Sequence, residues 1–526
     1  MWRVTMPIRY TGDVQNGWSL GSAASEKGWV AFFNDQYAGG KGKADPGYWL
    51  DYPPLRLLIM TKWAGWTKST FGARGWQQSY EFHAPVLASN TIAAFLGSVA
   101  AFLVVWLWAR RSVADPSPWA GFLKGAIAAT LLWFNPAVLW IGHGFPQWDL
   151  WVVPFFLFAI LAVCVDRFLI AGLLIATGAM MKGQMLCAAP VFLLWCIFAG
   201  RFEAALRFAI GFLAGAAVVA SPWLLQSIDA KIWVRNVLAA TAFAAPALLL
   251  RRAKWVRIIA IAIAITVILI PVLRPPQLAA REFIKFLILT ILLIVPLLIG
   301  VRHQRLPHLF AGAFAAAAFA CVPLFAGSLA WFDISFRRAG VRYNTMGTLS
   351  ASNLSTILER RFGWSFEGEN AAVRLAPYLG ISWFDPLPLP KLLYALFAIG
   401  LVLCGIAAAI QSRRHSARLV LALMLPFVLM FMLLPHMHNR YLIYASATSC
   451  VLVAVGVGPA LLGVLISLAC WSMMAVNQFE SNREYSGQWY TALAGLHVDI
   501  GWALLLMAAT LLYLALYPGR RCPMLF

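Results

Sequence analysis

The sequence has little charge, and few of its charged residues are acidic. Of 526 residues only 12% are charged, whereas 62% are hydrophobic, and the mean hydropathy is +0.76. Soluble domains are closer to about half apolar, so a soluble globular protein is excluded. Apolar runs of roughly the 20 residues that a membrane-spanning helix needs recur from Ser89 to Leu516. Because these runs are continuous rather than alternating, they predict an all-α polytopic membrane protein.

The sequence also lacks the patterns of metal, disulfide or nucleotide chemistry. None of its eight cysteines forms a metal-type pair or implies a disulfide framework. All except Cys522 lie in apolar runs, as small core residues do. There is no Rossmann fingerprint, and the glycine-rich segment 39–43 lacks Walker spacing. We therefore expect no metal and no cofactor. A signal peptide is missing too, and more than eighty residues of soluble character come first.

Basic residues outnumber acidic ones, 41 to 20, which gives a net charge of +21. They cluster in short loops between apolar runs, as the positive-inside rule and anionic lipid headgroups predict. No basic stripe with interleaved aromatic residues forms a groove for nucleic acid, so nucleic acid is not an expected partner. Part of the positive excess can serve an anionic lipid substrate.

The apolar runs predict a bundle of thirteen to fifteen membrane-spanning helices, with the region 236–300 the hardest to divide. The expected spans are 89–109, 119–141, 148–165, 168–181, 185–200, 208–225, 236–250, 256–273, 284–300, 309–328, 390–410, 417–435, 441–456, 458–476 and 499–517. The basic loops then fall on one side, which the positive-inside rule makes cytoplasmic.

This alternation divides the chain into four parts. We expect an extracytoplasmic first loop with interfacial helices at 1–85, and a transmembrane bundle at 86–328. A long extracytoplasmic loop at 329–388 and C-terminal transmembrane helices at 389–526 follow. The polar residues that could take part in catalysis or binding therefore collect on the extracytoplasmic face of the membrane.

The segment from Trp49 to Leu55, which contains Asp51, Tyr52 and two prolines, predicts the start of a helix. Asp51 can cap a helix, and prolines suit first-turn positions where no N–H is needed. The following residues to Trp66 are apolar with interspersed Arg56, Thr61 and Lys62. That mixture predicts an interfacial helix, and Asp51 and Tyr52 are expected to line the site nearby.

Two polar clusters contain carboxylates. Asp13 follows Gly12 ahead of a helix-compatible stretch, where an N-cap is the alternative to a catalytic role. His143, Gln147 and Asp149 lie between two apolar runs. A cap explains Asp149 alone, but it does not explain His143 and Gln147, since ionisable groups at the ends of apolar helices need water or partners.

Two further clusters are cationic. Lys182 and Gln184 lie in a very short turn, where the lysine breaks the positive-inside pattern. It either meets a phosphate or snorkels to the interface. His436, His438 and Arg440 follow a span. Two histidines at i, i+2 without Cys or Glu do not fit zinc, whereas imidazole and guanidinium donors suit a phosphate.

These clusters together predict an extracytoplasmic site at the membrane surface with one carboxylate and several cationic side chains. Such a set of groups suits the transfer of a sugar from a lipid phosphate. The carboxylate deprotonates the attacking hydroxyl, and the cations stabilise the charge that grows on the leaving phosphate. The sugar arrives on a membrane lipid, so no nucleotide-binding domain is needed.

In this order the motifs resemble those of the GT-C-fold glycosyltransferases that use polyprenyl- or dolichyl-phosphate sugars. Two branches are similar: the ER dolichyl-phosphate-glucose glucosyltransferases and bacterial membrane mannosyltransferase-like proteins. The matching elements are Gly12-Asp13, the segment 50–55, Asn135-Pro136 with His143 to Gln147, Lys182-x-Gln184 before Ala189-Pro190, Ser352 to Leu354, and His436 to Arg440.

The resemblance implies a GT-C bundle and an inverting hexosyltransferase with Asp13 as catalytic base. It also implies donor or phosphate ligands at Lys182, Gln184, His436, His438 and Arg440, in the positions of the family's motifs. The expected partners are a polyprenyl-phosphate sugar, a lipid-linked or envelope glycan acceptor and membrane lipids.

The expected location is a bacterial inner membrane with an extracytoplasmic site. Family members carry a span just before the first loop, which is expected ahead of Met1. Asn439 stands where the family often has Glu, and Gly183 stands where bacterial relatives tend to have Pro.

Two other classes compete with this interpretation. A lipid or solute transporter, such as a flippase, would place charges deep within spans and show related halves. The sequence shows neither of these features. An O-antigen-type polymerase or ligase would rely on basic residues in its external loops rather than on Asp13.

Overall fold

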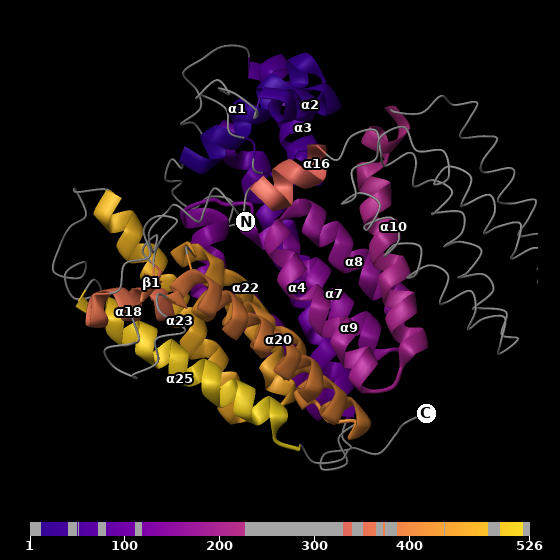
Figure 1. Cartoon of the computed structure of the whole chain (residues 1–526), viewed down its shortest axis with the longest axis vertical. Helices are drawn as coiled ribbons and strands as arrows, with labels where there is room; N and C mark the ends of the chain where they lie inside the picture. The colour runs from indigo at the N-terminus through magenta and orange to yellow at the C-terminus, as the bar shows by residue number, and fades with distance from the viewer. Residues whose placement is uncertain are drawn as a thin grey trace, which may run out of the picture. The chain divides into compact units, whose positions relative to one another are not determined.

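The computed structural model describes residues 12–39, 50, 52–71, 80–110, 118–226, 330–338, 351–363, 372–373, 387–435, 437–481 and 495–518. Figure 1 draws the described helices and strands as ribbons, and by its internal contacts the chain divides into two compact units. One comprises Met1–Ala216 and Ile334–Phe526, and the other comprises Ala217–Asp333. The spans expected between 236 and 328 lie outside the described residues, and so does most of the loop expected at 329–388.

Five helices in the described part of the chain are long and apolar enough to cross a membrane. They lie in α4 (Tyr80–Arg110), α10 (Phe202–Gln226), α20 (Leu389–Arg413), α23 (Val457–Ser481) and α25 (His497–Leu516). A sixth span forms if α5 (Pro118–Trp133) continues through a 42° bend into α6 (Pro136–Leu139) and η1 (Trp140–Gly144). The chain is an all-α protein with the helices of an integral membrane protein; the larger span count remains a prediction.

Other expected spans correspond to shorter or broken helices. These are α7 (Val153–Cys164), α8 (Phe168–Met181), α9 (Ala189–Phe198) and α21 (Arg418–Leu433). The apolar run 441–456 is not one helix: it divides into η6 (Asn439–Leu442), α22 (Ile443–Thr448) and η7 (Ser449–Ala454). Thr448 and Ser449 hydroxyls donate to carbonyls three or four residues earlier, as such residues do where helices deform.

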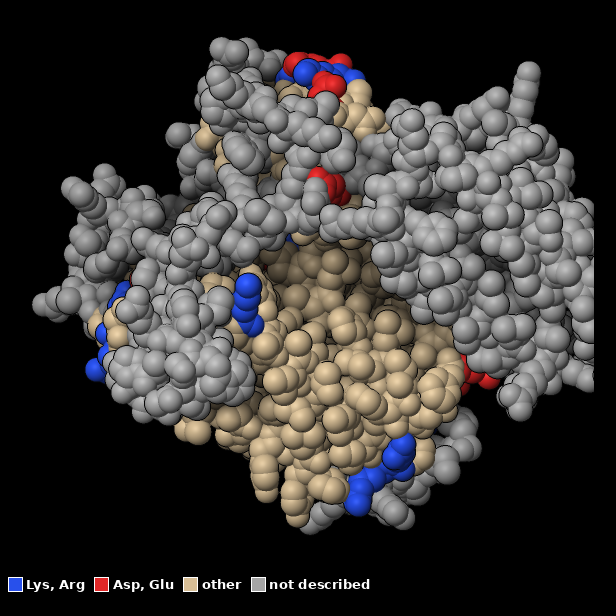
Figure 2. Space-filling view, viewed as in Figure 1, with Lys and Arg blue, Asp and Glu red and all other residues tan. Residues whose placement is uncertain are grey.

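The core of the larger unit is centred on α21, whose residues from Leu419 to Met432 are all buried. Phe427 of α21 contacts Phe156 of α7 and Tyr444 of α22, with ring centroids 4.7 and 5.6 Å apart. By contrast, α5 exposes Trp119, Phe122 and Leu123. In Figure 2 the described surface in the middle of the face shown is mostly uncharged. A buried central helix with apolar outer helices is the arrangement expected in lipid.

Three helices at the start of the chain pack on one another. They are α1 (Gly12–Lys27), α2 (Trp29–Gly39) and α3 (Pro54–Phe71). The two prolines start α3 as expected, but the capping position is Pro53 and not Asp51, because the Pro53 carbonyl accepts the first helical bond, from Leu57 N–H. Asp51 itself lies outside the described residues.

The contact between α1 and α3 is close. A Cβ on Gly21 of α1 would lie 2.3 Å from the Met60 carbonyl oxygen of α3. The expected helix over Leu55–Trp66 is therefore confirmed and extends to Phe71, with one face covered by α1.

The last described elements belong to the C-terminal half. Helix α18 (Leu354–Phe362) has Asn353 as its N-cap, which accepts from Thr356 N–H, and it ends at Gly363 with φ of 67°. The Asn353 amide also donates to the Phe431 and Leu434 carbonyls at the end of α21. Two-residue strands β1 (Ala372–Val373) and β2 (Leu387–Pro388) pair antiparallel before α20.

Candidate functional site

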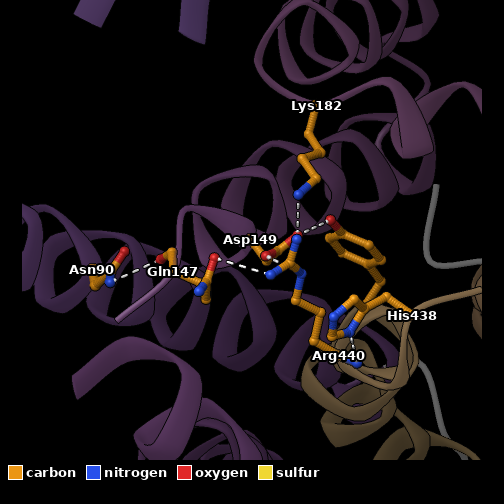
Figure 3. Close-up of polar contacts among 7 residues, drawn as sticks. Asn90, Gln147, Asp149, Lys182, His438 and Arg440 are labelled. Carbon is orange, nitrogen blue, oxygen red and sulfur yellow. Dashed lines mark hydrogen bonds and ion pairs between the residues drawn. The ribbon is translucent and has the colours of Figure 1, made fainter. Parts of the chain in front are cut away.

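Asp149 lies at the centre of a buried polar cluster, with none of its surface exposed (Figure 3). Lys182 Nζ lies 2.6 Å from its Oδ1, and the Tyr444 hydroxyl donates to the same oxygen at 2.5 Å. Arg440 Nε lies 3.8 Å from Oδ2. Oδ2 accepts no hydrogen bond from the residues that the structure describes. The carboxylate is therefore an ion held by two cations and one hydroxyl.

Three segments far apart in the chain build this cluster. Asp149 opens the short helix η2 (Asp149–Val152), directly before α7. Lys182 follows the end of α8 in extended conformation and precedes η3 (Gly183–Cys187). Arg440 is on η6, and Tyr444 is one turn later on α22. The expectation that Asp149 merely caps a helix is not supported, since its side chain makes no cap bond to η2 and points at Lys182.

A second layer of contacts holds Gln147 and His143. Gln147 Oε1 accepts from Arg440 Nη1 at 3.4 Å, and its backbone carbonyl accepts from Asn90 Nδ2 at 3.0 Å. The same amide donates to the Gly142 carbonyl at 2.8 Å. His143 Nε2 lies 3.0 Å from Thr91 Oγ1, and its ring is fully buried. Helix α4, through Asn90 and Thr91, thus fixes the turn that presents Gln147 to the cluster.

The other expected phosphate ligands have no direct contact with the Asp149 carboxylate among the described residues. His438 Nδ1 accepts from the Arg440 backbone N–H at 3.4 Å and so shapes the turn that carries Arg440. Gln184 is half-buried on η3. His436 lies outside the described residues. Of the ligands expected from sequence, Lys182 and Arg440 reach the carboxylate directly.

Asp13 is the second residue of α1, and its side chain lies outside what the structure describes. The helix itself nevertheless runs beside the cluster. A Cβ on Gly17 of α1 would lie 3.2 Å from the Trp148 ring. Trp148 directly precedes Asp149. The first half of α1 is therefore adjacent to the turn that carries the buried carboxylate.

Arg56 is a member of the site that the sequence did not single out. It is only 4% exposed, on the buried face of α3 with Leu57, Met60 and Trp63. Its guanidinium carbon lies 3.8 Å from the centroid of the Tyr52 ring. The signal was present in the sequence: Arg56 stands four and seven residues before Met60 and Trp63, inside the apolar stripe of its helix.

Positive charge exceeds negative charge at this site. Burial lowers the pKa of Lys182, Asp149 raises it, and the charges of Arg56 and Arg440 lower it further, to about 8. Lys182 and Arg440 thus lie against Asp149, and Arg56 lies close enough to Lys182 for the two positive charges to interact. Buried cations in excess of their counter-ions are the arrangement that binds anions.

Asn135, at the Asn-Pro motif, has a structural role. Its side-chain oxygen caps α6 by accepting from the Ala137 and Val138 N–H groups. Its amide donates to Ser467 Oγ at 2.9 Å and to Ser446 Oγ at 3.1 Å. The motif therefore ties the first half of the chain to α22 and α23 and does not face Asp149.

Within the described ranges, no group of three or more His, Cys, Asp or Glu side chains could hold a metal ion. Neither the comparison with protein-family models nor the comparison with curated proteins finds a match for this chain. The candidate site is accordingly defined by its own geometry: a buried, net-cationic cluster at the ends of apolar helices.

Proposed function

We propose that the chain is an inverting membrane glycosyltransferase of the GT-C type. It would move a hexose from a polyprenyl phosphate to a lipid-linked or cell-envelope acceptor on the extracytoplasmic face of a bacterial inner membrane. The observation that supports this most is the pair of cations Lys182 and Arg440 against Asp149, with Arg56 near Lys182, buried among apolar helices.

The depth of the cluster suits a substrate with a lipid tail. Helix α8 has 14 residues, which span about 21 Å at 1.5 Å per residue. An exposed ion pair between Asp166 and Arg201 marks its N-terminal end, and Lys182 marks the other. A hydrocarbon core is roughly 30 Å thick, and in this proposal Lys182, just beyond the end of the short helix α8, lies at the edge of that core. A phosphate can reach it there while its polyprenyl chain stays in lipid.

The chemistry divides between a base and the cations. The acceptor hydroxyl oxygen forms a bond to the anomeric carbon as the bond from that carbon to the phosphate oxygen breaks. The hydroxyl proton goes to the Asp13 carboxylate, and the electron pair of the broken bond stays on the polyprenyl phosphate. Lys182 and Arg440 then stabilise a phosphate that has gained a negative charge. No nucleotide and no metal enters this scheme.

Transfer from a defined donor tests the proposal. Membranes that contain the chain are incubated with a panel of radiolabelled polyprenyl-phosphate sugars, beside a control enzyme of known donor. We expect one sugar to leave its donor, and Asp13→Asn to reduce that transfer by about a hundredfold or more, as loss of a general base does. Asp35→Asn, on exposed Asp35 of α2, is the matched control and should leave transfer unchanged.

Three results would count against the proposal. If no sugar leaves any donor while the control enzyme works, the donor class is wrong. If Asp13→Asn folds and transfers sugar at the original rate, the assignment of the base fails and a polymerase or ligase that uses basic residues replaces it. If the labelled lipid crosses the membrane with its sugar still attached, the chain is a flippase.

A further inference from the structure

The guanidinium of Arg56 is a buried cation that forms no ion pair with the side chains that the structure describes. Apart from ring contacts, with the Tyr52 centroid at 3.8 Å and the Trp148 centroid at 5.7 Å, no partner is recorded for it within the described chain. Its Nε is buried without a hydrogen bond. Aromatic faces stabilise a guanidinium only weakly, and this does not replace the hydration that burial removes. The edge of the group therefore favours an anion as its ligand.

The N-terminus of α3, the helix that carries Arg56, also favours an anion. In α3 the first backbone bond runs from Leu57 N–H to the Pro53 carbonyl. The N–H groups of Leu55 and Arg56 precede it and have no intrahelical acceptor. The positive end of the helix dipole also lies here, where a cation is unfavourable and an anion is favoured. Two free donors and a buried guanidinium thus meet in one turn.

This turn lies next to the cluster around Asp149. Trp148, which the Arg56 guanidinium approaches, immediately precedes Asp149 in the chain. Arg56 is also close enough to Lys182 for its charge to lower the pKa of the amine. Lys182, Arg440 and Arg56 counted against Asp149 give these four side chains two positive charges in excess. A phosphate diester carries one negative charge, whereas a phosphate monoester approaches two.

We propose that Arg56 and the first turn of α3 form a second anion subsite, which binds the charge that appears on the lipid phosphate when the sugar leaves. This inference rests on the proposed function and extends it. The donor is a phosphodiester, and Lys182 with Arg440 is sufficient for its single charge. The product is a phosphomonoester, and Arg56 binds the oxygen that the sugar has left. The site is therefore more complementary to the product phosphate than to the donor.

Binding of sugar-free probes to the purified full-length protein in detergent tests this inference. The probes are a polyprenyl monophosphate, its methyl diester, the uncharged polyprenol and inorganic phosphate. We expect the monoester to bind about tenfold more tightly than the diester, as one additional charge-assisted contact predicts. In Arg56→Gln the monoester should lose about tenfold in affinity, while the diester loses no more than about threefold. Lys62→Gln, on the exposed side of the same helix, should change neither.

The melting temperature without ligand distinguishes a binding role from a structural one. Removing an uncompensated buried charge relieves a desolvation penalty, so ligand-free Arg56→Gln should melt at the original temperature or above it. A lower melting temperature with unchanged monoester affinity would make Arg56 structural and overturn the inference. If Arg56→Gln does not fold, Arg56→Lys replaces it in the test, because lysine keeps the positive charge but lacks the planar pair of N–H donors of the guanidinium. It should weaken the monoester about threefold, and unchanged binding would overturn the subsite.

The failure of this inference and that of the proposed function give different results. If the original protein binds neither ester, both the proposed donor class and the proposed anion subsite are refuted. If it binds the monoester and Arg56→Gln binds equally well, the subsite alone is refuted. Competition by inorganic phosphate as strong as that of the lipid monoester would assign the subsite to free phosphate and overturn the lipid assignment. Equal binding of the polyprenol would show that no anion is recognised.

Discussion

Replacing Asp149 by Asn tests whether the buried cluster acts as one electrostatic unit. The substitution keeps the shape and one acceptor oxygen but removes the charge that compensates Lys182 and Arg440. The Asp149 and Lys182 side chains are 0% and 8% exposed, and breaking such a pair costs about 3–5 kcal/mol because a buried cation loses its partner. The Tyr444 hydroxyl can still donate to Asn, so we expect about 3 kcal/mol, at the lower end of that range.

The free energy of unfolding is measured by titrating mixed micelles with denaturing detergent and following helicity by circular dichroism. Asp166→Asn is the matched control, since it breaks an ion pair with Arg201 whose side chains are 61% and 40% exposed. An exposed pair contributes at most about 1 kcal/mol. Asp149→Asn combined with Lys182→Met should recover about 2 kcal/mol, because the unpaired cation is removed as well. Equal losses for Asp149→Asn and Asp166→Asn would refute the reasoning.

Two further predictions follow from charge and packing. Because burial and the nearby charges of Arg56 and Arg440 outweigh Asp149 and lower the pKa of Lys182 to about 8, monoester affinity should fall above that pH, by up to about tenfold per unit, as the amine loses its proton. The phosphate stays dianionic there, and Lys182→Arg should give a flat profile from pH 7 to 9.5; a flat profile in the original protein would contradict the role of Lys182. A Cβ on Gly172 of α8 would lie 2.0 Å from the Phe208 carbonyl oxygen of α10, so Gly172→Ala should cost about 1–3 kcal/mol in the same detergent titration. Gly458→Ala, whose Cβ meets nothing within 4 Å, is its control, and equal stability of the two variants would exclude close packing of α8 on α10.

Much of the local structure could be predicted from the sequence. Apolar runs gave helices, and the prolines at 53 and 54 started α3. The polar residues at the ends of apolar runs proved to be neighbours in the cases of Gln147, Asp149, Lys182 and Arg440. This worked because a charged group at the end of an apolar helix has few ways to avoid a partner.

The features of the fold and the site that the sequence did not predict depend on tertiary contacts. Arg56 was predicted to be one polar residue of an interfacial helix; its spacing to Met60 and Trp63 marks the apolar stripe, but the sequence does not show that α1 covers α3. Tyr444 lies inside an apolar run and gives no signal of its hydrogen bond to Asp149. The same run was expected to be one span and is three short helices, since composition does not reveal hydroxyls that bond to their own backbone. The roles of Asp13, Asp51 and His436 stay predictions.

The order in which the cluster is synthesised has a consequence for membrane insertion. Asp149 and Lys182 flank α7 and α8, so they enter the membrane within the same stage of translation and can form a neutral pair at once. Tyr444 follows 295 positions after Asp149, and Arg440 arrives with it. The pair can therefore form early, and Arg440 adds a further positive charge only when the C-terminal helices dock. A chain truncated before η6 should therefore insert with Asp149 and Lys182 paired, but without Arg440 as the second cation beside them.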